Sequence, residues 1–282
     1  IQEEEILMKY FQVPINVATS GKSDYEAMLT GYIPDNIMQE QKERMRPAVL
    51  ILPGGGYEYT SDREAEPIAL EFIRRGVCAF VLRYSIAPAR FPQALCEALE
   101  SIAYIRENAS EWDIDPDNIA VCGFSAGGHL CASVGTFWNN SILDAYINRS
   151  RTVMKPNMLI LSYPVITSGE YAHRGSFDAL LGENQRDESL SLVSLEKQVT
   201  ADVPPTFIWH TYEDGCVPVQ NTMLFANELI AHNVPTEVHI YRRGGHGLSL
   251  GNYLVDTERQ FGEEHISSEW IKHAVRFMFD NK

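Results

Sequence analysis

The chain has 282 residues, of which 45% are hydrophobic and 22% charged. This balance is typical of a folded globular protein and excludes disordered, collagen-like and disulfide-stapled chains. Acidic residues outnumber basic ones by 38 to 23, and the resulting net charge of -15 opposes binding to nucleic acid and to anionic membrane surfaces. At this length we expect one domain over residues 1–282.

The five cysteines include no C-x-x-C pair, and their odd number would leave one cysteine unpaired. The sequence therefore indicates neither a disulfide framework nor a zinc site. No stretch approaches the roughly 18 uninterrupted apolar residues of a membrane span, and the start lacks the order of a signal peptide. We therefore expect a cytoplasmic protein. The presence of an upstream leader stays open because the chain does not begin with Met. Association into a homo-oligomer is a separate open question.

Short apolar runs bounded by turn residues predict buried strands at 48–52, 77–82, 119–122, 158–163, 206–209 and 237–241. Apolar residues at spacings of three and four predict helices at 64–75, 91–108, 127–137, 219–232 and 267–279. This alternation predicts an α/β fold with a doubly wound, mostly parallel sheet covered by helices on both faces. In such sheets, ligands bind beyond the carboxyl ends of the strands.

Residues 167–200, before the strand at 206–209, interrupt the alternation because they are polar and lack a clear strand. Two interpretations carry equal weight: a small lid over the site, or a long surface excursion with short helices.

The sequence Gly123-Phe124-Ser125-Ala126-Gly127 directly follows the strand at 119–122 and precedes a helix. It is a G-x-S-x-G pattern in the context of a nucleophile elbow. That turn needs small residues two positions before and after the serine, because larger side chains would collide. Ser125 is the predicted nucleophile.

Three glycines end the strand at 48–52, in the sequence Pro53-Gly54-Gly55-Gly56-Tyr57. Such a loop can direct bare backbone N–H groups at an oxyanion. The predicted donors are the N–H groups of Ala126, which follows the nucleophile, and of Gly54 or Gly55.

These motifs resemble those of serine esterases of the α/β-hydrolase fold, in the branch of acetyl-xylan-esterase-like and hormone-sensitive-lipase-like carboxylesterases. The branch's oxyanion loop reads H-G-G-G followed by an aromatic residue; here Pro53 replaces the His, and Tyr57 holds the aromatic place. The segment 83–88, which contains Tyr84, is similar to a Y-R-L-A-P segment beside the active-site entrance. The resemblance implies that Tyr57 and Tyr84 contact substrate.

In this fold the acid and then the base follow the serine along the chain. His246 lies between glycines just after the last predicted strand, and it is the predicted base; His210, at a strand end, is the main competitor. We expect His129, four residues after Ser125, to pack locally. Asp214, in a D-x-x-V-P pattern that resembles the family's acid loop, is the predicted acid, with Glu213 as the alternative.

No metal-ligand or nucleotide-binding motif is present, so neither a metal nor a cofactor is implied. The prediction is a serine carboxylesterase that hydrolyses small acyl esters through an acyl-enzyme, and the resemblance implies acetyl groups on sugars or xylan oligosaccharides. Two alternatives stay open: a prolyl-oligopeptidase-type peptidase, and a noncatalytic binding module on a hydrolase scaffold.

Overall fold

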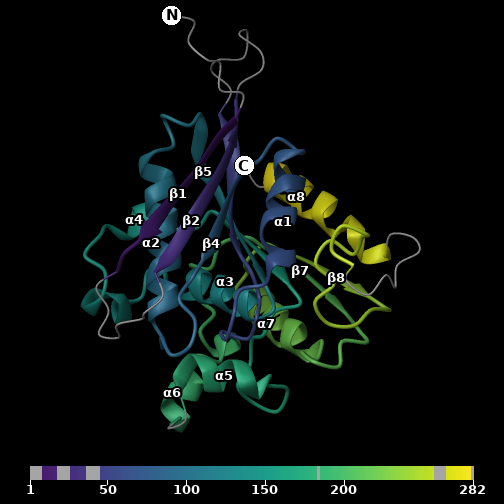
Figure 1. The fold of residues 1–282 in the computed structure, drawn as a ribbon. Helices are drawn as coiled ribbons and strands as arrows, with labels where there is room; N and C mark the ends of the chain where they lie inside the picture. The colour runs from purple at the N-terminus through teal and green to yellow at the C-terminus, as the bar shows by residue number, and fades with distance from the viewer. Residues whose placement is uncertain (1–7, 18–25, 36–44, 183–184, 257–264, 281–282) are drawn as a thin grey trace, which may run out of the picture.

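The computed structural model (Figure 1) describes residues 8–17, 26–35, 45–182, 185–256 and 265–280. Within these ranges, eight strands form one sheet in the order β1-β2-β4-β3-β5-β6-β7-β8. Strands β3 to β8 run parallel to one another, whereas β1 and β2 are antiparallel to their neighbours. The strands are β1 Met8–Ile15, β2 Ala27–Pro34, β3 Arg46–Leu52, β4 Cys78–Arg83, β5 Ile114–Phe124, β6 Met158–Ser162, β7 Thr206–Thr211 and β8 Thr236–Tyr241.

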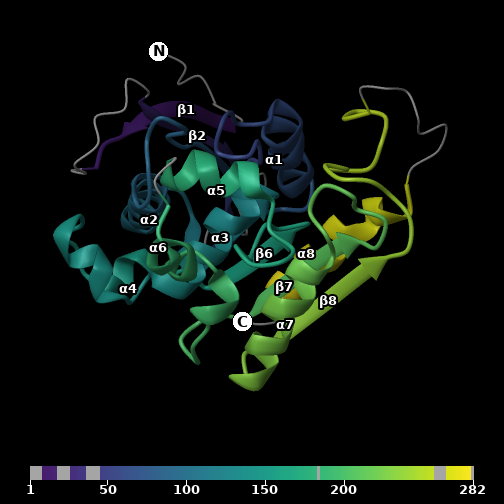
Figure 2. The ribbon, with the colours of Figure 1, turned by 90° about the horizontal axis from the view of Figure 1, so that it is seen from below.

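Helices cover both faces of this sheet (Figures 1 and 2). One face packs against α2 (Gln93–Glu107), α3 (Ala126–Phe137) and α7 (Gln220–Ala231). The other face packs against α1 (Glu66–Ile73) and α8 (Trp270–Asp280). The predicted fold class, α/β with a mostly parallel, doubly covered sheet, is confirmed.

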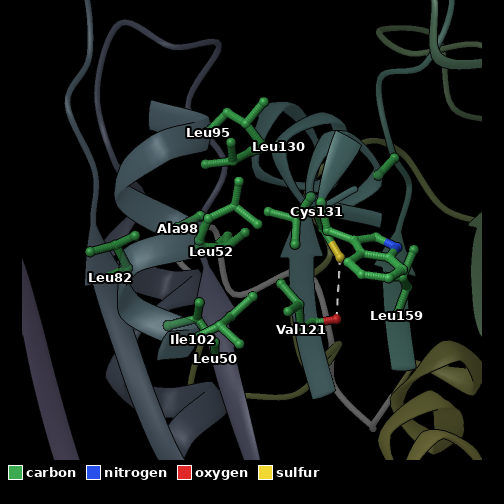
Figure 3. Packing of buried hydrophobic residues seen from close by; sticks show 14 of the residues in the cluster. Leu50, Leu52, Leu82, Leu95, Ala98, Ile102, Val121, Leu130, Cys131 and Leu159 are labelled. Atoms are coloured by element: carbon green, nitrogen blue, oxygen red, sulfur yellow. Dashed lines mark hydrogen bonds between the residues drawn. The ribbon is translucent and has the colours of Figure 1, made fainter. Parts of the chain in front are cut away.

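Strand β3 shows how the sequence builds two cores from one sheet. Successive side chains of a strand point to opposite faces. Leu50 and Leu52 therefore pack among the residues of α2 and α3, whereas Val49 and Ile51 pack on the side of α1 and α8. Figure 3 shows the first of these cores, where Leu50 and Leu52 meet side chains of α2 and of α3.

The sequence prediction missed β1 and β2, and their positions explain why. Strand β1 is the sheet edge, and most of its side chains are exposed or half-buried, so it lacks the continuous apolar run of a central strand. Strand β2 contains Gly31, which weakens a strand pattern. The glycine is needed because a Cβ there would lie 2.5 Å from the ring of Phe11 in β1.

The interruption at 167–200 forms short helices, α5 (Arg174–Leu181) and α6 (Asp187–Leu192). Both lie below α3 in Figure 1 and in front of it in Figure 2. Another short helix, α4 (Arg151–Met154), precedes β6. None of the helices in the described ranges is both long and apolar enough to cross a lipid bilayer.

Replacement of a core leucine tests this packing. Leu50 is fully buried in the central strand β3, so Leu50→Ala should lower the free energy of unfolding by about 3 kcal/mol through lost contacts and a cavity. Leu70→Ala on α1 is the matched control, because Leu70 is 47% exposed and its loss should cost about 0.5 kcal/mol or less. Urea denaturation measures both; equal losses would contradict the assigned core.

Candidate active site

Ser125 occupies the sharp turn between β5 and α3. Its φ of 52° and ψ of -117° are unfavourable for a residue with a Cβ, by about 1–3 kcal/mol. Backbone bonds hold the turn in place: the Ser125 N–H donates to the Ser162 carbonyl at 3.0 Å, and the Ser125 carbonyl accepts from the Val165 N–H at 3.1 Å. The strained conformation is therefore fixed by the end of strand β6 and by the residues that follow it.

The two glycines of the motif are required by close backbone contacts. A Cβ at Gly123 would collide with the Gly127 carbonyl, and one at Gly127 would collide with the carbonyls of Leu52 and Pro53. Since these neighbours are backbone atoms, they cannot move aside as a flexible side chain would. The turn that presents Ser125 is thus possible only with small residues at both positions, as the nucleophile elbow requires.

The structure brings Ser125, His246 and Asp214 into one hydrogen-bonded chain. His246 Nε2 lies 2.8 Å from Ser125 Oγ, and His246 Nδ1 lies 2.7 Å from Asp214 Oδ2. The three residues follow β5, β8 and β7 respectively, so the carboxyl ends of parallel strands assemble them. With Nδ1–H donated to the carboxylate, Nε2 is free to accept the serine proton.

Asp214 is buried and accepts several further hydrogen bonds. Its Oδ1 accepts from the N–H groups of Cys216 and Val217, both at 2.9 Å. Burial by itself raises the pKa of Asp214, but hydrogen bonds from His210 and His246 outweigh burial and hold the pKa well below its ordinary value. The carboxylate is therefore ionised and fixed in direction at neutral pH.

His210, the competing base, lies behind the acid and not beside the serine. Its Nε2 faces two acceptors, the Val217 carbonyl at 2.9 Å and Asp214 Oδ2 at 3.2 Å, so this nitrogen carries a proton. Its Nδ1 bonds the Thr222 hydroxyl at 2.8 Å. Glu213, the alternative acid, is exposed and accepts from the Gly244 N–H at 3.3 Å.

The glycine loop after β3 corrects one predicted oxyanion donor. The Gly54 N–H donates to Glu64 Oε2 at 2.8 Å, so it is already occupied. Among the described residues, no protein acceptor binds the N–H groups of Gly55, Gly56 or Ala126. Gly54 instead leaves room for the Ser125 side chain, because a Cβ at position 54 would lie 3.0 Å from Ser125 Cβ. A run of glycines in the sequence does not reveal which of their N–H groups already has a protein acceptor.

Tyr57 and Tyr84 do not have the predicted role in substrate contact. Both are buried, at 3% and 0% exposure, and both hydroxyls have protein partners. Tyr84 donates to the Pro53 carbonyl at 2.6 Å, and the Tyr57 hydroxyl lies 2.8 Å from His129 Nδ1. The two rings support the glycine loop from beneath, so the prediction is wrong.

Buried Glu64 links the glycine loop to the loop that carries His246. Its Oε1 accepts from the Tyr163 hydroxyl at 2.6 Å, while its Oε2 accepts from Gly54. The Tyr163 oxygen in turn accepts from the Ser249 N–H at 3.0 Å, and the Tyr163 ring lies edge-on to His246 at 5.1 Å. Sequence reasoning missed Glu64 because it was read only as the start of a helix.

His129 joins the glycine loop to residues 167–200. Its Nε2 lies 2.8 Å from the Val193 carbonyl, which can only accept, so Nε2 carries the proton and Nδ1 accepts from Tyr57. Phe177 of α5 packs edge-on against the imidazole at 5.5 Å. His129 therefore packs locally, as expected, and burial lowers its pKa to about 4.

One group of possible metal ligands lies in the described ranges, formed by Glu237 and His239 of β8 with His273 of α8. The sequence contained no such motif because the residues come from separate elements. The guanidinium of Arg276 lies 3.3 Å from Glu237 Oε1, and His239 Nε2 bonds the same oxygen at 2.6 Å. The carboxylate thus already has partners within the protein.

Comparison with known proteins places this architecture in a family. The chain matches the BD-FAE family over residues 35–229. The chain belongs to the BD-FAE family, whose members are α/β-hydrolase esterases. This membership confirms the resemblance to acetylxylan esterases and hormone-sensitive-lipase-like carboxylesterases.

Among solved structures, an acetyl ester-xyloside bifunctional hydrolase from Caldicellulosiruptor lactoaceticus is 33% identical, with a TM-score of 0.82 over 98% of both chains. A carboxylesterase from Lactobacillus plantarum is 26% identical, with a TM-score of 0.80 over 97% of this chain and 98% of that one.

Among curated proteins, endo-1,4-beta-xylanase B of Butyrivibrio fibrisolvens is 39% identical over 84% of this chain and 38% of its own length. An acetylxylan esterase of Xylanibacter ruminicola is 26% identical over 85% of this chain and 46% of its own length. The chain thus spans less than half of these two relatives.

Removal of the Glu64 carboxylate should destabilise the fold. Glu64→Ala leaves the buried Gly54 N–H and Tyr163 hydroxyl without their acceptor, at a cost of about 1–3 kcal/mol for each. Glu66→Ala is the control, because exposed Glu66 accepts one bond from Tyr32 and should cost about 1 kcal/mol or less. Urea denaturation measures both, and equal losses would disprove the assigned link.

Titration of His129 should make stability depend on pH. Its pKa falls on folding from 6.5 to about 4, so between these values the unfolded chain binds a proton that the native state does not. The free energy of unfolding therefore keeps its full value above pH 6.5, and it falls by about 3 kcal/mol as the pH drops toward 4.

The substitution His129→Gln keeps one acceptor and one donor but removes this titration. Unfolding free energies measured in urea from pH 4 to pH 7 should show a smaller slope in the variant than in the wild type. His232→Gln, at the end of α7, is the control and should keep the wild-type slope. Parallel curves for wild type and His129→Gln would refute the assignment.

Proposed function

We propose that this chain is a serine carboxylesterase in which Ser125 is the nucleophile, His246 the general base and acid, and Asp214 the residue that orients His246. The observation that carries the proposal is the continuous chain of hydrogen bonds, 2.8 Å from Ser125 Oγ to His246 Nε2 and 2.7 Å from His246 Nδ1 to Asp214 Oδ2. Both distances lie within the reach that proton transfer needs.

In acylation, Ser125 Oγ attacks the ester carbonyl carbon as its proton passes to His246 Nε2. The carbonyl oxygen gains the negative charge, and the free N–H groups of Ala126 and Gly55, with Gly56 beside them, are the donors that stabilise it. The intermediate then breaks its bond to the alcohol oxygen, which takes the proton from His246. An acyl-enzyme ester on Ser125 and a free alcohol result.

In deacylation, a water molecule gives a proton to His246 Nε2 and its oxygen attacks the acyl carbon. Collapse of the second intermediate returns the proton to Ser125 Oγ and releases the carboxylic acid. The ionised Asp214 stabilises the imidazolium in both steps, and its buried, hydrogen-bonded position keeps its direction constant.

The substrate that we propose is a small acyl ester, above all an acetyl group on a xylose-containing sugar. The relatives support this choice, since one is named an acetylxylan esterase and another an acetyl ester-xyloside hydrolase. The peptidase alternative uses the same three residue types, so it becomes an outcome of the experiment below.

A series of p-nitrophenyl esters from acetate to decanoate tests the proposal. Wild-type activity should be highest on acetate and fall with chain length, and Ser125→Ala should lower kcat by several orders of magnitude because the three residues act as a unit. Ser150→Ala is the control, since Ser150 is exposed and directly precedes α4, in the connection that leads to the amino end of β6. It should keep wild-type rates.

Three results would contradict the proposal. Equal ester hydrolysis by wild type and Ser125→Ala would remove Ser125 from the reaction. A wild type that cleaves an aminoacyl p-nitroanilide but none of the esters would favour the peptidase. A wild type that cleaves neither the esters nor the anilide and does not react with an organophosphonate would favour a noncatalytic module.

A further inference from the structure

His173 and Ser176 form a polar pair at the start of α5, within residues 167–200. His173 Nδ1 lies 2.8 Å from the Ser176 hydroxyl oxygen, and the Ser176 N–H donates to the His173 carbonyl at 3.1 Å. Ser176 is buried and His173 half-buried. No hydrogen-bond partner of His173 Nε2 is found in the part of the chain that the structure describes, so this atom is available to a ligand.

The pair lies beside the catalytic groups. The Ser176 hydroxyl oxygen is 3.9 Å from the position that a Cβ of Gly56 would take, which places it against the oxyanion loop. Burial lowers the pKa of His173, and the charge of His246 lowers it further, whereas the carboxylates of Asp214 and Glu58 raise it. His173 thus lies within electrostatic reach of His246 and of Glu58, which follows the oxyanion loop.

The loop that carries His173 is held in place before any ligand arrives. Asn221 of α7 accepts from the Ile166 and Thr167 N–H groups at 2.9 and 3.1 Å, and it donates to the Tyr171 carbonyl at 2.9 Å. The guanidinium of Arg174 donates to the Ser168 and Gly169 carbonyls at 2.7 and 2.8 Å. Such a fixed loop reduces the entropy lost when a ligand binds.

The side of the substrate that faces His173 follows from the reaction. His246 Nε2 must protonate the leaving alcohol oxygen, so the alcohol lies on the His246 side of the ester. The imidazole of His173 near His246 therefore meets the alcohol and not the acyl group. Its Nε2 is a donor or an acceptor according to the tautomer, and a hydroxyl group suits both because it donates and accepts.

We propose that His173, oriented by Ser176, is a specificity residue that binds a free hydroxyl next to the acetylated position of a sugar. The inference rests on the proposed function and deepens it, because it assigns the alcohol side of the substrate to the 167–200 segment. A leaving group without such a hydroxyl gains nothing from His173. Selectivity for sugar esters then arises from one hydrogen bond added beside the triad.

Kinetics on two acetate esters test the proposal. One substrate is a methyl xyloside with a single acetyl group and free neighbouring hydroxyls, and the other is p-nitrophenyl acetate, which has none. His173→Ala should lower kcat/KM on the xyloside by about tenfold, the value of one such hydrogen bond, and should leave p-nitrophenyl acetate within twofold. His173→Phe keeps an aromatic ring but removes both ring nitrogens, and it should give the same selective loss. This second variant keeps the test valid if His173→Ala folds poorly.

His232→Ala is the matched control, because His232 bonds only the Glu228 carbonyl of its own helix among the described residues, and it should change neither rate. Equal losses on both esters, or no loss on the xyloside, would overturn the role of His173 while the esterase itself stands. Ser125→Ala separates the two proposals: if it is as active as wild type on p-nitrophenyl acetate, the proposed function fails and the role of His173 fails with it.

Discussion

The backbone turn at Ser125 is the constraint on which the rest of the site depends. It forces a residue with a Cβ into a left-handed conformation, and it brings the start of α3 against the end of β3 so closely that only glycine fits at Gly127. This close approach places Ser125 beside the glycine loop. The same turn requires Gly54, because a Cβ there would lie 2.8 Å from the Phe124 carbonyl oxygen and 3.0 Å from Ser125 Cβ.

A second layer of hydrogen bonds keeps the site rigid around that turn. Glu64 fixes the glycine loop through Gly54 and reaches the His246 loop through Tyr163 and Ser249. Arg63 adds bonds to the Gly247 and Val255 carbonyls at 2.6 and 2.9 Å. Two adjacent residues, Arg63 and Glu64, thus connect the glycine loop to the loop that carries His246.

The sequence predicted the parts of the site that are encoded locally. Ser125 and His246 stand among glycines directly after strands, so short patterns reveal them. Glu64 contacts Tyr163 across 99 positions of the chain, and no local pattern records such a pair. The same limit explains the errors at Gly54, Tyr57 and Tyr84, because residue type does not show which group already has a protein partner. The edge strand β1 was missed because it lacks burial on both faces.

His129 bonds the glycine loop through Tyr57 and the 167–200 segment through Val193 with one imidazole. The segment is therefore not an independent module on the hydrolase scaffold. An exchange of this segment between relatives, whether in evolution or in chimeric enzymes, has to preserve a carbonyl at the place of Val193. Otherwise the exchange must also replace His129 and Tyr57. The residues at these three positions therefore have to change together.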